Sequence, residues 1–229
     1  MARFSLTGTV AGMKNIRRFA FVPYIVLCVV HFVAIAAHQD DVVAATKPLL
    51  MALLLVTFLV AAPRLTMPTL VLTSLALAFS MAGDVSLQSP ASIGFLIGLA
   101  FFFLAQISYI TLFVKVGSGK LSWFTSLYAA WFVALIVILL PGLGSLTIPV
   151  MVYGLVLGSM ATLATRVNSV TATGGALFLA SDTLLALDRF APNITMIFSD
   201  ELIMGTYMVG EGLLVFGIVR YLNRATPEI

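Results

Sequence analysis

Charge is the scarcest property of this 229-residue chain. Only 9% of its residues are charged and 61% are hydrophobic, whereas soluble domains contain about 25% charged residues. Because so little polar surface cannot cover a water-soluble globule, we expect an integral membrane protein. Cys28 is the one cysteine, so the chain cannot form an internal disulfide. The net charge of +3 comes from basic residues scattered singly between apolar runs, so we expect no nucleic-acid binding.

Histidine is also scarce. Of the two histidines, only His31 lies within an apolar run, with no second histidine near it in depth. Zinc sites are usually built from several histidine, cysteine or carboxylate ligands. We therefore expect neither a metal site nor another cofactor.

The apolar residues gather into runs long enough to cross a bilayer as helices, which takes about 17–25 residues. Short breaks such as Pro141-Gly142 separate them, and no soluble domain is left over. The prediction is an all-α polytopic bundle of eight transmembrane helices within residues 19–222, between a basic cytoplasmic segment 1–18 and a cytoplasmic tail 223–229. The eight runs are 19–37, 47–62, 68–87, 91–114, 122–140, 147–165, 171–188 and 200–221.

The first run could instead be a cleaved signal peptide, because basic residues precede it. Its apolar core of about 19 residues exceeds the 7–15 typical of a signal peptide. We therefore expect a retained helix.

The basic residues alternate regularly with these runs. With eight crossings, ten of the twelve Lys and Arg residues fall on one side of the membrane and only Lys47 and Arg189 on the other. The positive-inside rule then makes both termini cytoplasmic. The predicted location is the cell membrane, with membrane lipids as surroundings and no obligate protein partner.

Two aspartates lie inside the apolar runs. A carboxylate at bilayer depth costs roughly 2.5–3.5 kcal/mol on insertion scales, and such residues are functional by default. A helical rise of about 1.5 Å per residue places Asp84 roughly 24 Å above the inner end of its helix, in the outer third of a core about 30 Å thick. Asp182 falls near the midplane, slightly toward the outer side. Asp84 and Asp182 are the predicted catalytic residues.

Further polar residues share helix faces at i,i+3 or i,i+4 spacing. Ser80 precedes Asp84 by one turn, and Tyr207 precedes Glu211 by one turn. Each pair gives its helix a polar stripe. The arrangement with the lowest free-energy cost turns these stripes toward each other and away from lipid. We therefore expect a polar pocket that opens toward the outer leaflet.

Five successive stretches of the chain resemble signatures of the YhhN-like lysoplasmalogenase family. Gln106 stands where that family often has histidine, and Glu211 where it often has glutamine. If that histidine transfers protons in relatives, Gln106 cannot do so here. The stretches are Thr46–Leu50, Ala78–Asp84, Ala105–Tyr109, Pro149–Tyr153 with Met160, and Leu177–Phe190.

The resemblance implies a hydrolase that cleaves the vinyl ether bond of a lysoplasmalogen, a lysophospholipid, into a fatty aldehyde and a glycerophospho-alcohol. Protonating the β-carbon of a vinyl ether creates an oxocarbenium ion that water attacks. Our hypothesis is that desolvation keeps Asp182 protonated as general acid while Asp84 stays ionised beside Lys47, although the two roles could be exchanged. Lys47 or Arg189 could hold the phosphate. The predicted substrate-binding residues are Lys47, Gln106, Tyr109, Tyr153, Ser181, Arg189, Tyr207 and Glu211.

Three other functions are alternative explanations of the same buried carboxyl groups. A proton-coupled transporter would favour inverted repeats and helices broken near the midplane, and neither is evident. An intramembrane aspartyl protease usually carries Gly-x-Gly-Asp, whereas this chain has Met81-Ala82-Gly83-Asp84. A lipid-binding protein without catalytic activity would leave its lipid unchanged.

Overall fold

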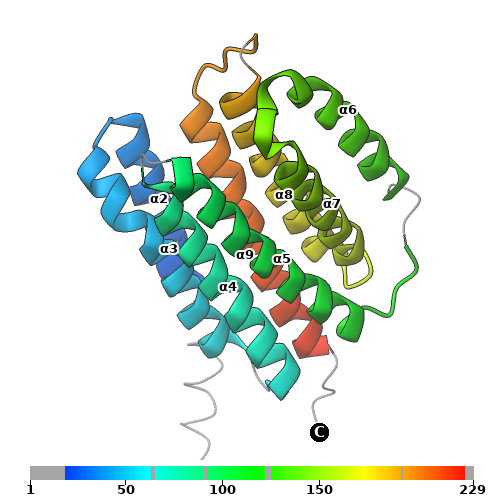
Figure 1. Cartoon of the computed structure of the whole chain (residues 1–229). Coiled ribbons are helices and arrows are strands. Elements are labelled where there is room, and N and C mark those ends of the chain that lie inside the picture. The colour runs from blue at the N-terminus through cyan, green and yellow to red at the C-terminus, as the bar shows by residue number, and fades with distance from the viewer. Residues whose placement is uncertain (1–18, 63–64, 90–91, 122–124, 192, 225–229) are drawn as a thin grey trace, which may run out of the picture.

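The computed structural model describes residues 19–62, 65–89, 92–121, 125–191 and 193–224, which form a bundle of helices (Figure 1). No β-strand occurs in these ranges. A short 3-10 turn, Gly144–Leu146, joins α6 to α7. The helices are α2 (Val22–Ala36), α3 (Asp40–Ala61), α4 (Met67–Leu87), α5 (Ser92–Val116), α6 (Thr125–Leu143), α7 (Thr147–Ala164), α8 (Ser169–Phe190) and α9 (Ser199–Arg224).

Within the described part of the chain, six helical stretches are long and apolar enough to cross a membrane, which indicates a multi-pass membrane protein. One of them, residues 125–164, runs through both α6 and α7, and α2 is shorter than the others at 15 residues. Every predicted apolar run thus contains a helix, but eight separate crossings stay a prediction. The basic segment 1–18 and residues 225–229, on which the cytoplasmic termini depend, lie outside the described residues.

Two predicted helix boundaries were wrong. We expected Lys47 to open its helix, but α3 begins seven residues earlier at Asp40, with acidic residues in its first turn. Carboxylates there are favoured by the partial positive charge of a helix N-terminus. The predicted Pro141-Gly142 turn lies within α6, which ends only at Leu143. Proline lacks an N–H, yet the helix continues past it for two more residues.

α9 is the central helix. Of its most apolar 18-residue window, 61% is buried, against 22–44% in the other candidate spans. It contacts α2 and α3 on one side and packs most extensively on α8 (Figure 1). The Tyr207 and Glu211 side chains in the middle of α9 are accordingly buried in the bundle interior.

Glycines bring α8 and α9 close together. A Cβ atom at Gly174 would lie 2.6 Å from the Leu214 nitrogen and 2.8 Å from the Gly210 oxygen. Such contacts leave no space for any side chain at this position. Small residues that let backbones approach are typical of helix interfaces in membranes.

Large apolar side chains cover much of the outer surface. On α2, for example, Ile25, Val26, Val29 and Val33 are each more than half exposed. Contiguous apolar surface of this extent is a liability in water. It fits a helix that faces lipid.

Candidate active site

Among the described residues, three carboxyl groups in the middle of the bundle each accept a hydrogen bond from a tyrosine on another helix. Asp84 of α4 is 2% exposed. The Tyr207 hydroxyl of α9 donates to Asp84 Oδ2 at 2.8 Å. The predicted pairing of polar stripes is thus present between α4 and α9.

Glu211, also on α9, is fully buried and accepts two hydrogen bonds. The Tyr109 hydroxyl of α5 donates to its Oε2 at 2.6 Å, and the Ser80 hydroxyl of α4 donates to its Oε1 at 2.8 Å. Both oxygens are therefore occupied by protein donors. Two hydrogen bonds thus link α4 and α9. Tyr207 of α9 donates to Asp84 of α4, and Ser80 of α4 donates to Glu211 of α9.

Asp182 of α8 has a different environment. It accepts a hydrogen bond from the Tyr153 hydroxyl of α7, but it is only half-buried. It lines a cavity of about 50 Å³ whose wall is otherwise largely apolar, including Leu99, Phe102 and Phe190. A water molecule occupies about 30 Å³ in the liquid, so the space suits one or two waters or a small group.

An aromatic cluster connects the cavity wall to the Asp84 side. The rings of Phe102, Phe178 and Tyr207 pack edge to face with centroids 5.5–6.2 Å apart. Phe102 lines the cavity, while Tyr207 holds Asp84. Asp84 and Asp182 are also close enough to interact electrostatically. The aromatic cluster and this electrostatic interaction therefore connect Asp84 with the Asp182 cavity.

Lys47 lies near Asp84. Its half-buried side chain on α3 is within electrostatic range of both Asp84 and His31. The His31 Nδ1 atom shares a hydrogen bond of 2.7 Å with the Thr46 hydroxyl. A cation therefore stands on the α3 side of Asp84, as its position in the sequence suggested.

Arg189 lies at the edge of the cavity. Its side chain is exposed, and the guanidinium carbon is 4.3 Å from the centre of the Phe95 ring. Phe95 itself lines the cavity next to Asp182. The Arg189 guanidinium is thus available to a charged lipid headgroup that stays outside the cavity.

Ser181 and Gln106 are placed less favourably for binding a substrate. The Ser181 hydroxyl donates to the Ile203 carbonyl at 3.0 Å, which ties α8 to α9. Gln106 is fully buried and lies near the Tyr153 hydroxyl. Neither polar atom of its side chain has a hydrogen-bond partner among the described residues. The structure therefore brings Gln106 to the site without giving it a defined contact.

Sequence reasoning missed Phe102 and Tyr24. Phe102 is one of 17 phenylalanines, and nothing in its local pattern marks it as a cavity residue. The Tyr24 hydroxyl donates to the Met208 carbonyl at 2.7 Å and lies within electrostatic range of Glu211 and Asp84. It comes from α2, so only the tertiary fold reveals it.

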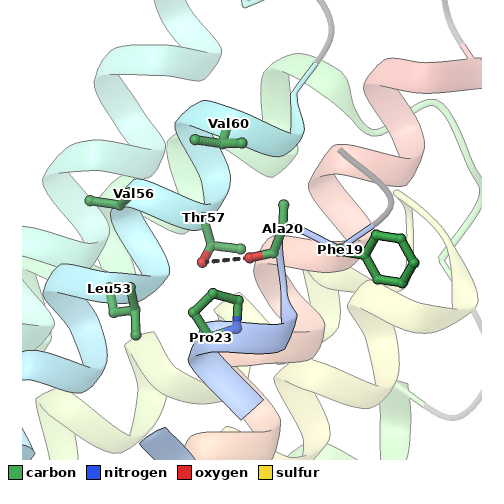
Figure 2. Close-up of a pocket in the computed structure, with 7 residues that line it drawn as sticks. All are labelled: Phe19, Ala20, Pro23, Leu53, Val56, Thr57 and Val60. Carbon is green, nitrogen blue, oxygen red and sulfur yellow. Dashed lines mark hydrogen bonds between the residues drawn. The ribbon is translucent and has the colours of Figure 1, made fainter. Parts of the chain in front are cut away.

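Another hollow, of about 480 Å³, lies between the start of α2 and the end of α3 (Figure 2). The Thr57 hydroxyl donates to the Ala20 carbonyl there at 3.3 Å. Among the described residues that line it, the others have apolar side chains, such as Pro23 and Val60, and none is titratable. The carboxyl groups therefore remain the candidate active site.

A comparison with protein families matches residues 42–218 to the model of the YhhN family. The matched region contains all three carboxyl groups and their tyrosine donors. Comparisons with curated proteins and with solved structures give no match.

Proposed function

The chain belongs to the YhhN family of membrane proteins, and from its carboxyl site we propose that it is a lysoplasmalogenase. In this proposal it hydrolyses the vinyl ether bond of a lysoplasmalogen in the cell membrane. One observation carries the reaction: Asp182 lines a small, mostly apolar cavity while the charged Lys47 lies beside the other aspartate.

The reaction needs a proton donor next to an apolar substrate atom. The alkenyl carbon that takes up the proton is part of a hydrocarbon chain, so it must reach the acid through apolar surroundings. Asp182 meets this requirement because Leu99, Phe102 and Leu185 line the same cavity. A neutral carboxyl held by Tyr153 would transfer its proton to this carbon and break the carbon–carbon π bond.

The resulting oxocarbenium ion needs a nearby negative charge and a water molecule. In this proposal Asp84 supplies the charge, because Lys47 lies within electrostatic range of it and the Tyr207 hydroxyl donates to its Oδ2 atom. Water adds to the oxocarbenium carbon and gives up a proton, which restores the acid. The hemiacetal then collapses to a fatty aldehyde and the free hydroxyl of the glycerophospho-alcohol.

The headgroup remains at the membrane surface in this proposal. The exposed Arg189 beside the cavity and the half-buried Lys47 are the cations available for its phosphate. The eight crossings predicted from the sequence would place both on the outer side. Choline and ethanolamine headgroups are equally compatible with this arrangement.

The test uses full-length protein purified in detergent and two lysoplasmalogens, with choline or ethanolamine headgroups. Mass spectrometry follows the fatty aldehyde. We expect release by the wild type, loss in Asp182→Asn and Asp84→Asn, and retention in Asp188→Asn, an exposed aspartate on the same helix as Asp182. Intact lipid after incubation with folded wild type would contradict the proposal and favour a transporter or a lipid-binding protein.

Isotopic labelling tests the mechanism separately. In D₂O the proposed protonation puts one deuterium on the carbon next to the aldehyde carbonyl. In H₂¹⁸O the glycerophospho-alcohol carries no label, because water attacks the oxocarbenium carbon and the glycerol oxygen leaves with the alcohol. An aldehyde without deuterium would exclude protonation of the alkene.

A further inference from the structure

A groove on the outside of the bundle adjoins the Asp182 cavity. It lies between α5 and α7 and has a volume of about 460 Å³. Binding sites for small molecules typically measure about 300–1,000 Å³. Its outward walls are formed by Leu96, Ala100 and Leu104 on α5 and by Ile148 and Val152 on α7.

The groove and the cavity share two lining residues. Leu99 of α5 and Tyr153 of α7 line both spaces. Tyr153 is also the hydrogen-bond donor of Asp182. A side-chain movement of Leu99 or Tyr153 would therefore connect the lipid-facing groove with the carboxyl group.

The groove has the chemistry of a hydrocarbon site. Of the described residues that line it, Tyr153 alone has a titratable side chain, and the others are apolar. From Leu96 to Leu104 it follows α5 for about 12 Å, at a helical rise of 1.5 Å per residue. Its outward residues are exposed on the surface that faces lipid, so a chain can enter sideways from the bilayer.

A larger groove between α2 and α9, of about 670 Å³, lacks this connection. Its lining includes Tyr24, Val29 and Val209 but none of the three carboxyl groups. The Tyr24 hydroxyl is already bonded to the Met208 carbonyl. Volume alone therefore does not identify the substrate groove, whereas continuity with Asp182 does.

We propose that the α5/α7 groove binds the hydrocarbon chain of the lipid substrate. The chain enters the Asp182 cavity sideways past Leu99 and Tyr153. This inference rests on the proposed function, because the occupant is the single chain of a lysophospholipid. It also makes the groove the determinant of chain-length preference. A side chain that fills the groove should exclude long chains more than short ones.

The binding test does not require turnover. A saturated 1-O-alkyl lysophosphocholine with a diazirine in its chain lacks the alkene that the reaction protonates. After photolysis with the full-length protein, mass spectrometry locates the label. We expect labelling of α5 at 96–104 and of α7 at 148–152, and reduced labelling in Ala100→Trp.

Matched variants separate the two grooves. Val29→Trp fills the α2/α9 groove and should leave the labelling unchanged, while Val152→Trp provides a second block of the α5/α7 groove. Ala100, Val152 and Val29 are all exposed, so these changes spare the core. Labelling concentrated on α2 and α9, or unaffected by both Ala100→Trp and Val152→Trp, would overturn the inference.

Chain-length kinetics give an independent readout. In Ala100→Trp we expect kcat/KM for an 18-carbon alkenyl chain to fall by about tenfold or more relative to a 10-carbon chain. The same ratio in Ala100→Trp and wild type would contradict the inference. Specific labelling of the groove without any aldehyde release would instead support the groove as a binding site for the hydrocarbon chain and refute the proposed reaction.

Discussion

Tyr207 donates its hydroxyl hydrogen to Asp84 at 2.8 Å and joins α9 to α4 inside the bundle. Its ring also packs on Phe102, which lines the Asp182 cavity. One side chain thus contacts Asp84 through its hydroxyl and the cavity wall through its ring. These two functions can be separated by mutation.

Tyr207→Phe removes the hydroxyl and keeps the ring. We expect kcat to fall about 10- to 100-fold, because the Asp84 carboxylate loses a donor that favours its charged form. The free energy of unfolding should fall by only about 1–2 kcal/mol. Aldehyde release and thermal unfolding measure the two effects. Tyr221→Phe, on the same helix, is the control and should change neither.

Glu211→Gln tests whether the third carboxyl group takes part in proton transfer. Both Glu211 oxygens accept bonds from hydroxyl groups, those of Ser80 and Tyr109. A glutamine keeps one acceptor, and a hydroxyl group that rotates can accept from its amide. We therefore expect activity within about threefold of the wild type.

The alanine variant should behave differently. Glu211→Ala leaves the Ser80 and Tyr109 hydroxyls without their partner in a buried site, so we expect a loss of about 2–4 kcal/mol in stability. A glutamine variant that folds like the wild type but releases no aldehyde would show that Glu211 acts as an acid or base.

The sequence allowed prediction of the helices and the choice of Asp84 and Asp182 as candidates, because both inferences depend on the free-energy cost of polar groups in lipid. Asp84 and Asp182 were conspicuous within apolar runs, and Ser80 could be placed on the Asp84 face by its spacing. The family resemblance added Tyr109 and Tyr153. Some helix ends were predicted at the wrong residue, because local sequence preferences compete there with helix packing. Pro141, for example, was expected to end its helix but lies within α6.

Partners across the bundle could not be predicted in the same way. Any of several tyrosines could have served each carboxyl group, and the assignment of Tyr207 to Asp84 depends on how α9 packs against α4. The residues of the cavity wall are harder still to predict, because Phe102 differs from other phenylalanines only in its tertiary contacts. Close packing of α8 on α9 through Gly174 likewise depends on the facing backbone.

Gly174→Ala should destabilise the bundle. Its Cβ atom would lie 2.6 Å from the Leu214 nitrogen, so the backbones of α8 and α9 must move apart. Overpacking of this kind costs about 1–3 kcal/mol. Thermal unfolding in detergent measures the loss. Gly205→Ala on α9 is the matched control, because its Cβ atom would meet Phe32 at an ordinary 3.5 Å. Equal unfolding temperatures for the two variants would contradict this account of the interface.

Gly83→Ala should impair catalysis through the cavity wall rather than through Asp84 itself. The added Cβ atom would lie 2.7 Å from the Phe102 ring, which is buried and must move. We expect kcat/KM to fall about tenfold, because small displacements of groups that position a substrate are costly. Combining Gly83→Ala with Phe102→Leu should restore part of the activity, since the smaller side chain leaves space for the methyl group. A double-mutant cycle measures this coupling, and additive losses would show that Gly83 affects the site by another route.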